Sequence, residues 1–434
     1  MGAGRSGTVS LCMIVRDEEA SLPACLESAR AYADQMIVVD TGSGDGTQEV
    51  ARKLGATVVE TSWNDDFAAA RNVSLEHATA DWILVLDADE TLQVEDPTAW
   101  RAELARSDRV GFLLALVNQG DEGETSRSLI LRCWRNDPSV RYEGIVHERV
   151  DPSLHRLAVA RGQEVGRLRA TIVHDGYRDS CVVAKHKRER DRRLLEKALS
   201  QTPDDSYLLY KTAVNPAYYP HDRKVVKACL ERAWSVLLSF PTREARRHPY
   251  AAEVAALLAL EKAKEGDLSG ALAACRAGEP LAIDSPNLYF VHGLVLQGAK
   301  RHAEGASAFA TALTFAGRDL LHAPLEGATS HASLCARSES LHVLGRDDEA
   351  VQDYGKAVAI KAGVSHAFYS PACQLVKENR AHRALKLISE RLARQPDDLV
   401  AWNRGREILE ALGEPRAVEV WMAQARKRGT AALR

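Results

Sequence analysis

Short apolar runs alternate with helical patterns along the first 180 residues. Apolar residues in compact runs predict strands at Val9 to Val15, Gln35 to Asp40, Ala56 to Glu60 and Trp82 to Asp87. Between them, helical spacing predicts helices at Glu18 to Tyr32, Gly46 to Gly55 and Phe67 to Ala78. Strand and helix in this rhythm predict a mostly parallel, Rossmann-like sheet with helices on both faces.

The pattern changes twice further along the chain. From about residue 110 it becomes β-rich and irregular, with the runs VGFLLALV, SLILRCWR and RLRATIVH, which we expect to add antiparallel strands to the sheet. After about residue 181 the strand patterns stop, and Ala and Leu recur at helical spacing between short turns. We therefore expect an α/β domain at 1–180, a helical linker at 181–265 and an all-α repeat region at 266–434.

The helical half contains a repeated motif of a small residue, an aromatic residue and Ala. Gly305, Phe309 and Ala312 stand at offsets of zero, four and seven, and Ala350, Tyr354 and Ala357 have the same spacing. A related copy begins 34 residues before Gly305, with Ala271 and Cys275. Another begins 34 residues after Ala350, with Ala384, Ile388 and Arg391, and is followed by Pro396 and Trp402. A last, shorter copy has Ala417 and Trp421. The motif resembles the tetratricopeptide repeat and predicts a solenoid, with an insertion around Gly317 to Thr329. A non-repeating helical bundle is the alternative.

Composition narrows the class of protein. A chain of 434 residues is long enough for two or three domains, and a net charge of -3 provides no general attraction for nucleic acid or an anionic membrane. The eight cysteines form no C-x-x-C pair. No signal peptide is apparent, and apolar runs such as Val110 to Val117 are far shorter than the ~20 residues of a membrane span. We expect a cytoplasmic protein without a membrane span or a nucleic-acid partner.

Charged residues gather where the predicted strands end. Asp40 ends one strand before a Gly-rich turn, and Asp87 and Asp89 follow another. Parallel sheets place such ends at one edge, where Asp40 could accept a hydrogen bond from a base or ribose. Two carboxylates in a D-x-D motif could hold Mg²⁺ or Mn²⁺ together with a diphosphate, and Arg71 could bind phosphate. The alternatives are a solvated turn, a helix cap at Asp45 or Thr47, and a surface arginine.

Four segments in this order, SLCMIVRDEEASLPACLES, MIVVDTGSGDGT, DDFAAARN and WILVLDADE, resemble family 2 glycosyltransferases of the GT-A fold over about the first 90 residues. The resemblance implies a nucleotide-diphosphate sugar donor, usually a UDP-sugar, a divalent metal and inversion at the anomeric carbon. It also implies roles for individual residues: Asp40 at the uracil, Arg71 at the base or diphosphate, Asp87 at the ribose or metal, Asp89 at the metal, and Val15, Glu18 and Ala88 lining the nucleotide site.

Downstream residues are candidates for the base and for further metal ligands. An inverting transferase needs a group that deprotonates the acceptor, and Glu148 stands about where family members place it, with Glu143 as the competitor. His174 ends a predicted strand and could reach the metal, as could His147. For each of these residues an ordinary surface or core position is the alternative.

The stretch from His174 to Asp205 resembles a subgroup that joins this catalytic domain to tetratricopeptide repeats, as in glycocin peptide S-glycosyltransferases such as the sublancin enzyme. The leading hypothesis is therefore a UDP-sugar transferase acting on a Cys or Ser/Thr side chain of a ribosomally made peptide, with the repeats helping to hold the acceptor. The alternatives are a saccharide, lipid-linked or small-molecule acceptor, and a non-catalytic repeat scaffold. Val420 and Trp421 could expose apolar surface and make the protein a homodimer.

Overall fold

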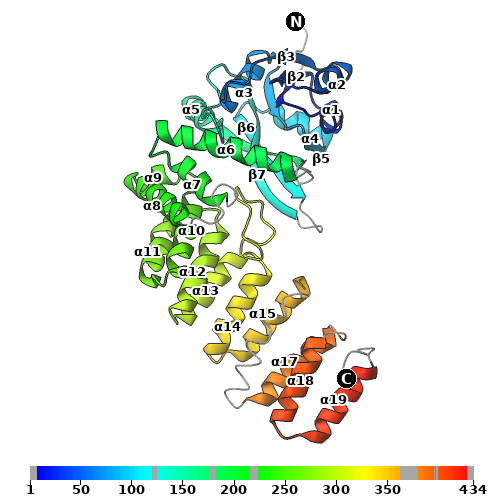
Figure 1. Cartoon of the computed structure of the whole chain (residues 1–434), viewed down its shortest axis with the longest axis vertical. Helices are drawn as coiled ribbons and strands as arrows, with labels where there is room; N and C mark the ends of the chain where they lie inside the picture. The colour runs from blue at the N-terminus through cyan, green and yellow to red at the C-terminus, as the bar shows by residue number, and fades with distance from the viewer. Residues whose placement is uncertain are drawn as a thin grey trace. The chain divides into compact units, whose positions relative to one another are not determined.

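The computed structural model describes residues 7–119, 125–174, 181–215, 223–361, 380–394, 396 and 399–427. The chain forms two compact units. The first comprises Met1–Tyr250 together with Asp319–Ala323, and the second comprises Ala251–Arg318 and Pro324–Arg434. An α/β unit is thus followed by an all-α unit, as the sequence predicts (Figure 1).

An eight-stranded mixed sheet in the order β3-β2-β1-β4-β7-β6-β8-β5 organises the first unit. The four strands at one side are mutually parallel: β1 (Val9–Val15), β2 (Gln35–Asp40), β3 (Thr57–Glu60) and β4 (Trp82–Val85). Their register places Val15 beside Asp40, and Asp40 beside Glu60, at one edge of the sheet. The predicted strands are confirmed, and their carboxyl ends meet as parallel pairing requires.

Helices and apolar side chains cover both faces of these strands. The helices that alternate with them are α1 (Leu22–Ala29), α2 (Thr47–Lys53) and α3 (Phe67–Glu76), and α4 (Pro97–Leu104) comes later in the chain. In β1, Leu11 and Met13 belong to one buried apolar cluster, and Cys12, between them, belongs to a second. Successive residues of a strand point to opposite faces, so a continuous apolar run such as β1 has to be covered on both sides.

The remaining strands complete the sheet in a way that the sequence predicts only in part. β7 (Thr125–Arg135) pairs antiparallel with β4 and with β6 (Arg109–Gln119), and β8 (Glu164–His174) pairs antiparallel with β5 (Glu90–Val94). However, β8 lies parallel to β6, which corrects the expectation that all the additions are antiparallel. The helix α5 (Asp151–Arg161) lies between β7 and β8 in the chain. It carries the chain back across the sheet after β7, so that β8 starts at the same end as β6 and runs parallel to it.

Four further helices complete the first unit: α6 (Cys181–Gln201), α7 (Ser206–Val214), α8 (Arg223–Ser239) and α9 (Thr242–Ala245). Leu194 and Leu195 of α6 pack with Val146 in one buried cluster, against which Trp63 and Phe67 also lie. Arg193 of α6 forms an ion pair with Asp65 at 2.6 Å. These contacts fix the segment around Val146, which leads into the site described below.

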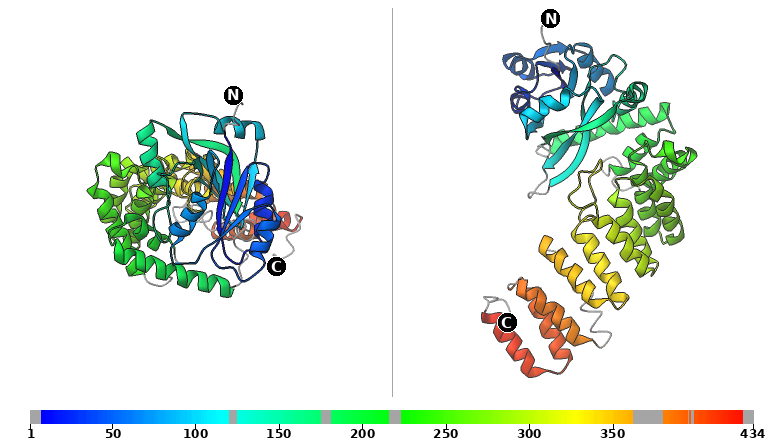
Figure 2. Two further views of the ribbon diagram at one scale, coloured as in Figure 1. Left: turned by 90° about the horizontal axis from the view of Figure 1, so that it is seen from above. Right: turned by 180° about the vertical axis from the view of Figure 1, so that it is seen from behind.

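The second unit is a series of antiparallel helix pairs, as Figure 2 shows in its right-hand view. The pairs are α10 (Ala251–Lys264) with α11 (Leu268–Gly278), α12 (Pro286–Gly298) with α13 (His302–Leu313), α14 (His331–Val343) with α15 (Asp347–Ile360), and α17 (Ala381–Arg394) with α18 (Leu399–Ala411), which also packs on α19 (Pro415–Lys427). Phe309 and Tyr354 are buried at equivalent positions of α13 and α15, as Cys275 and Ile388 are in α11 and α17. The predicted repeat is therefore confirmed as a tetratricopeptide-like array.

Gly293 offers a test of this repeat packing. A Cβ atom on Gly293 of α12 would lie 2.5 Å from the ring of Phe309, which is fully buried in α13. We expect Gly293→Ala to lower the free energy of unfolding by about 1–3 kcal/mol through overpacking. Gly298→Ala is the matched control, because its Cβ would meet only Leu268 at 3.7 Å. Equal stability of the two variants in urea denaturation would contradict the packing.

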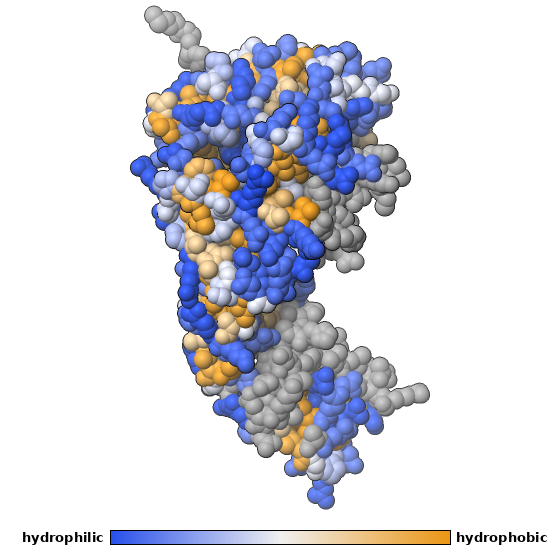
Figure 3. All heavy atoms as spheres, turned by 60° about the vertical axis from the view of Figure 1, so that its left-hand side comes forward, coloured by the Kyte–Doolittle hydropathy of each residue, from blue (hydrophilic) through white to orange (hydrophobic). Residues whose placement is uncertain are grey.

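The predicted insertion and the chain's surface complete the description. Within Gly317 to Thr329, Asp319–Ala323 belongs to the first unit, where the Leu320 carbonyl accepts a hydrogen bond from the Leu129 amide at 2.6 Å. Val420, near the C-terminus, is 59% exposed, as the sequence suggests. The homodimer that we expect to use this apolar surface stays a prediction. None of the helices in the described part of the chain has the length and apolar character that crossing a membrane requires. The face drawn in Figure 3 is largely hydrophilic with smaller apolar patches.

Candidate active site

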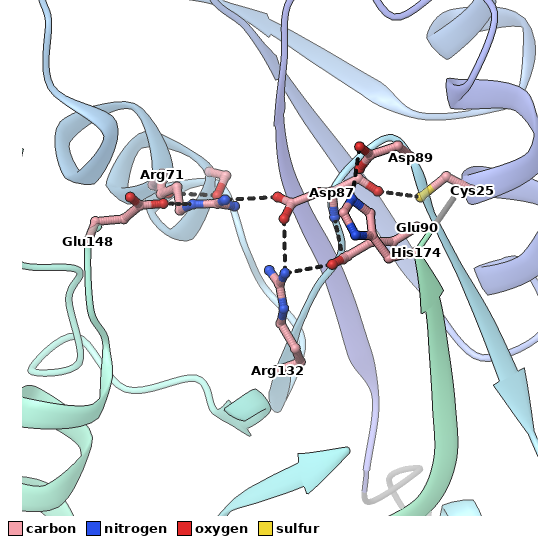
Figure 4. A network of polar contacts seen from close by, with 9 residues as sticks. Cys25, Arg71, Asp87, Asp89, Glu90, Arg132, Glu148 and His174 are labelled. Carbon is pink, nitrogen blue, oxygen red and sulfur yellow. Dashed lines mark hydrogen bonds and ion pairs between the residues drawn. The ribbon is translucent and has the colours of Figure 1, made fainter. Parts of the chain in front are cut away.

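A network of charged side chains lies where β4 ends (Figure 4). Arg71 of α3 donates from Nη2 to Oδ1 of Asp87 at 2.8 Å and from Nε to Oε1 of Glu148 at 2.5 Å. Only 11% of the Arg71 side chain and 13% of the Glu148 side chain are exposed. One guanidinium thus joins two carboxylates that stand 61 residues apart in the sequence.

The elements around Arg71 explain how it reaches both carboxylates. Asp66 caps α3 by accepting a hydrogen bond from the Ala69 amide at 2.8 Å, which fixes the start of the helix. Asn72, the next residue after Arg71, exchanges two hydrogen bonds with the backbone of Tyr142, at 2.8 and 3.0 Å. The Arg71 guanidinium lies 5.5 Å from the centre of the Tyr142 ring. Helix α3 therefore holds the segment that leads to Glu148.

The electrostatics of the network favour its charged form. Burial lowers the pKa of Arg71, but Asp87 and Glu148 raise it well above its ordinary value. Burial raises the pKa of Asp87, whereas Arg132 and Arg71 bring it far below the ordinary value for an aspartate. Both groups are therefore ionised at neutral pH. A desolvated guanidinium held in this way is suited to a phosphate or a developing negative charge.

Arg132 and Glu90 also belong to the network, although we assigned them no role from the sequence. From β7, Arg132 donates through Nη2 to Oδ2 of Asp87 at 2.9 Å and to Oε1 of Glu90 at 2.8 Å. Glu90 is 3% exposed, and its other oxygen accepts from the Asp87 amide at 2.8 Å. Arg132 interrupts the apolar run from Leu129 to Trp134 within β7, and a charged residue in such a run is the signal that the sequence offers. It orients Asp87 from the side opposite Arg71.

We expect Arg132→Met to lower the free energy of unfolding by about 3–5 kcal/mol, because it leaves the Glu90 carboxylate buried without its cation. The double variant Arg132→Met/Glu90→Leu should recover part of this loss, since it removes both charges. Arg106→Met is the control, because Arg106 pairs with Asp108 in solvent, and a change of less than ~0.5 kcal/mol is expected. Guanidinium denaturation measures all three. An Arg132→Met change as small as the control would contradict the network.

Asp89 and His174 face each other beside this network (Figure 4). Nε2 of His174 lies 3.1 Å from Oδ2 of Asp89, and Nδ1 lies 2.9 Å from Oδ1 of Asn118. The hydrogen bond with Asp89 raises the pKa of His174 above its ordinary value. In the tautomer that carries its proton on Nδ1, His174 donates to Asn118, and the lone pair of Nε2 points toward Asp89. Histidines that bind a metal through one ring nitrogen commonly donate a hydrogen bond from the other in this way.

This pair fits part of a metal site. A carboxylate and an imidazole would leave several positions of a hard divalent cation for water and phosphate oxygens, which is how Mg²⁺ is commonly held. Among the described residues, no group of three or more His, Cys, Asp or Glu side chains is arranged to hold a metal ion. Asp87 uses both oxygens for arginines, so its metal role stays a prediction.

Asp40 is the candidate for contact with a base. It is 2% exposed, and Oδ1 accepts hydrogen bonds from the amides of Gly42 and Ser43 at 3.0 Å and from Gln48 at 3.1 Å. Burial raises the pKa of Asp40, but hydrogen bonds from Ser43 and Gly42 lower it below the ordinary value. Oδ2 is buried without a partner, and an unpaired buried acceptor is costly unless a ligand supplies a donor.

The other expected nucleotide-site residues lie at or near the same edge. Val15 ends β1 and is buried, and the amide of Glu18 donates to Oγ1 of Thr47 at 2.8 Å. The Glu18 carboxylate accepts from the Ser21 hydroxyl. Ala88 is buried between the two aspartates of the D-x-D motif. The structure brings these residues to the carboxyl ends of β1, β2 and β4, and their contact with a nucleotide stays a prediction.

Glu143 and His147 have different surroundings from those of Glu148. Glu143 forms an ion pair with Arg156, and 47% of its side chain is exposed. Burial and Lys211 lower the pKa of His147 to about 4, so the nearby charge is positive, which disfavours a bound cation. The geometry therefore favours Glu148 over Glu143 as the base, and the metal role of His147 stays a prediction.

Comparisons with known proteins agree with this fold. Residues 10–146 match the family model described as glycosyl transferase family 2. A TPR repeat-containing protein of Synechococcus elongatus is 42% identical over 207 residues, which is 47% of this chain and 51% of that protein. The SPbeta prophage-derived glycosyltransferase SunS of Bacillus subtilis is 28% identical over 211 residues, 47% of this chain and 48% of that protein. The chain spans about half the length of these curated relatives.

The YrrB crystal structure, described as a TPR protein with an unusual peptide-binding site, covers 48% of this chain and 96% of its own, with a TM-score of 0.35 and 15% identity. Charged residues at the carboxyl ends of parallel strands are typical of α/β domains that bind a ligand at that edge. Residues 10–146 are thus similar to glycosyl transferase family 2 and are followed by tetratricopeptide-like repeats, and the chain is similar to SunS over 211 residues.

Proposed function

We propose that this protein is an inverting, metal-dependent glycosyltransferase that moves a hexose from a UDP-sugar to a Cys or Ser/Thr side chain of a peptide. The observation that supports this most strongly is Arg71 joining Asp87 and Glu148 beside the Asp89–His174 pair. A phosphate-binding cation, a candidate base and a partial metal site thus occur together at the edge where α/β domains bind ligands.

The donor would lie along the carboxyl ends of β2 and β4. Oδ2 of Asp40 would accept a hydrogen bond from the N–H of the uracil ring, which satisfies its unpaired position. Arg71 has a buried Nη1 without a partner and would donate to the diphosphate or to the base. These two residues would orient the nucleotide so that the sugar points away from the sheet edge.

Asp89 and His174 would hold Mg²⁺ or Mn²⁺, with a diphosphate completing the set of ligands. The cation would supply charge that stabilises the departing UDP. Asp87 would remain with its arginines and could meet the ribose. His174 must be deprotonated at Nε2 to serve as a ligand, so a bound cation would displace the proton that the Asp89 contact favours, while Nδ1 would donate to Asn118.

Glu148 would accept the proton of the acceptor thiol or hydroxyl while that atom attacks the anomeric carbon from the side opposite UDP. A single displacement of this kind inverts the configuration. In the structure Glu148 is bound to Arg71 at 2.5 Å, so a diphosphate that recruits Arg71 would also free the carboxylate. Proton abstraction would then depend on donor binding.

The peptide acceptor follows from two similarities. SunS is described as a glycosyltransferase, and in the sequence the catalytic domain resembles peptide S-glycosyltransferases. Helical repeats provide surfaces that commonly hold extended peptides. A saccharide, lipid-linked or small-molecule acceptor is the alternative with the same donor chemistry. A scaffold without catalysis is disfavoured by the intact charged network around Arg71.

Mass spectrometry tests this function directly. The full chain would be incubated with Mn²⁺, a panel of UDP-sugars and synthetic peptides that carry Cys or Ser. We expect one hexose to be added to a peptide side chain with an inverted anomeric configuration, determined by nuclear magnetic resonance. A retained configuration would refute the single displacement, and sugar transfer only to saccharides or lipids would replace the peptide by the alternative acceptor.

Asp40→Asn tests the donor site. The side-chain amide of Asn would place an N–H group opposite the uracil N–H, where Asp40 is proposed to accept a hydrogen bond. Two donors cannot pair, so we expect the dissociation constant for UDP to rise by about 10- to 100-fold. Asp45→Asn is the matched control, because Asp45 is exposed and accepts a hydrogen bond from the Thr47 amide at 3.0 Å, so its substitution should leave UDP affinity within about threefold. Isothermal titration calorimetry measures both. Unchanged affinity of Asp40→Asn would remove Asp40 from the base contact.

A further inference from the structure

A cluster of aromatic rings and cations adjoins the proposed base and is not used by the donor chemistry described above. Tyr207 and Tyr210 of α7 lie near Tyr250, with ring centres 5.2 and 5.4 Å from it. Arg149, the residue after Glu148, places its guanidinium 4.5 Å from the centre of the Tyr207 ring. The charge of Glu148 also contributes to raising the pKa of Tyr207, behind the larger effect of burial.

Lys211 is the member of this cluster that has no carboxylate partner among the described residues. Its ammonium lies 5.3 Å from the centre of the Tyr207 ring and 5.8 Å from that of Tyr210. Across the part of the chain that the structure describes, no carboxylate forms an ion pair with it, whereas Arg149 pairs with Asp151 at 2.6 Å. Burial, followed by Arg149, lowers the pKa of Lys211. A half-buried ammonium without a counter-ion is unfavourable unless a ligand provides one.

His147 connects this cluster to Glu148. Its backbone φ of 52° lies in the left-handed region, which is strained for a residue with a side chain and is frequent at functional sites. His147 and Arg149 flank Glu148 directly, and adjacent Cα atoms are ~3.8 Å apart. Arg149, which contacts the Tyr207 ring, thus links the cluster to the residue next to it in the chain, Glu148.

We propose that Lys211, Tyr207 and Tyr210 form an acceptor subsite that binds a carboxylate next to the side chain to be glycosylated. The favoured acceptor is therefore an acidic peptide segment, with Asp or Glu within about two residues of its Cys, Ser or Thr. The ammonium pairs with the carboxylate, the partly exposed Tyr207 ring packs against the adjoining peptide, and the buried Tyr210 ring supports Lys211 from within the protein. This inference rests on the proposed function and specifies its acceptor.

Paired peptides test the subsite. The full chain would be assayed with Mn²⁺, the active UDP-sugar and peptides that differ only by Glu or Gln one or two residues from the acceptor side chain. We expect kcat/KM to be at least tenfold higher for the Glu peptide than for the Gln peptide, mainly because its KM is lower. A tenfold preference corresponds to ~1.4 kcal/mol. Lys211→Met should bring the preference close to one, Lys211→Arg should retain most of it, and Lys211→Glu should reverse it. Lys197→Met, an exposed lysine of α6, is the control.

The outcomes separate this inference from the function it rests on. Donor hydrolysis by Lys211→Met at the rate of the unchanged protein shows that the variant folds and keeps its donor site. Equal use of Glu and Gln peptides by the unchanged protein would overturn the subsite while leaving the transferase intact. If no peptide is glycosylated, fluorescence anisotropy with the same labelled peptides measures the preference, and equal binding would overturn the subsite. Absence of donor hydrolysis and binding would instead refute the transferase itself.

Discussion

Glu148→Gln is expected to lower the rate of sugar transfer by about 10²- to 10⁴-fold while leaving UDP-sugar affinity within a few-fold of that of the unchanged protein. The amide keeps the size of the side chain but cannot take the proton of the acceptor. Single-turnover kinetics with a saturating donor would measure the loss. Because Gln still offers an oxygen to Arg71, we expect the fold and the donor site to be retained.

Glu143→Gln is the matched control for Glu148. Glu143 lies five residues earlier and pairs with Arg156, with 47% of its side chain exposed. Surface pairs of this kind contribute little, so the transfer rate of Glu143→Gln should stay within about twofold. Full activity of Glu148→Gln together with loss in Glu143→Gln would move the base to Glu143.

Asp89→Ala is expected to remove metal-dependent activity, with at least a ~10³-fold loss of transfer. The substitution deletes one of the two side chains that would hold the cation, and the stabilisation of the departing UDP is lost with it. The side chain is one-third exposed, so the fold should survive its removal. Titration of Mn²⁺ followed by electron paramagnetic resonance would show weakened binding together with the lost activity.

His174→Ala should weaken Mn²⁺ binding in the same experiment, because it removes the other proposed ligand. Asp108→Ala is the control, since Asp108 pairs with Arg106 at the surface away from the strand ends. It should bind Mn²⁺ as the unchanged protein does. Metal-stimulated activity that persists in Asp89→Ala would refute the metal role of Asp89.

The parallel half of the sheet and its edge could be predicted because they depend on local pattern. A continuous apolar run such as Trp82 to Val85 has to be buried on both faces, and a polar residue that follows it lies at the sheet edge. Asp40 and Asp87 are therefore located by the apolar runs that precede them. The repeat could be predicted for a similar reason, since Phe309 and Tyr354 recur at one spacing and are buried in equivalent helices.

Contacts between distant segments could not be predicted in this way. Arg132 lies in the run SLILRCWR, where nothing local indicates that β7 pairs with β4. The parallel pairing of β6 and β8 depends on the crossover through α5. Lys211 is an ordinary helical lysine in the sequence. Only the packing of α7 near Glu148 makes its missing counter-ion a sign of a ligand.

Release of UDP is the measurement that tests the central claim most directly. The unchanged protein and Asp89→Ala would be incubated with a panel of UDP-sugars, with Mn²⁺ and with a chelator, and free UDP would be quantified. We predict slow hydrolysis of one or a few UDP-sugars by the unchanged protein with Mn²⁺, abolished both by the chelator and in Asp89→Ala. If the unchanged protein neither binds nor hydrolyses any UDP-sugar under these conditions, the account of a UDP-sugar transferase is contradicted.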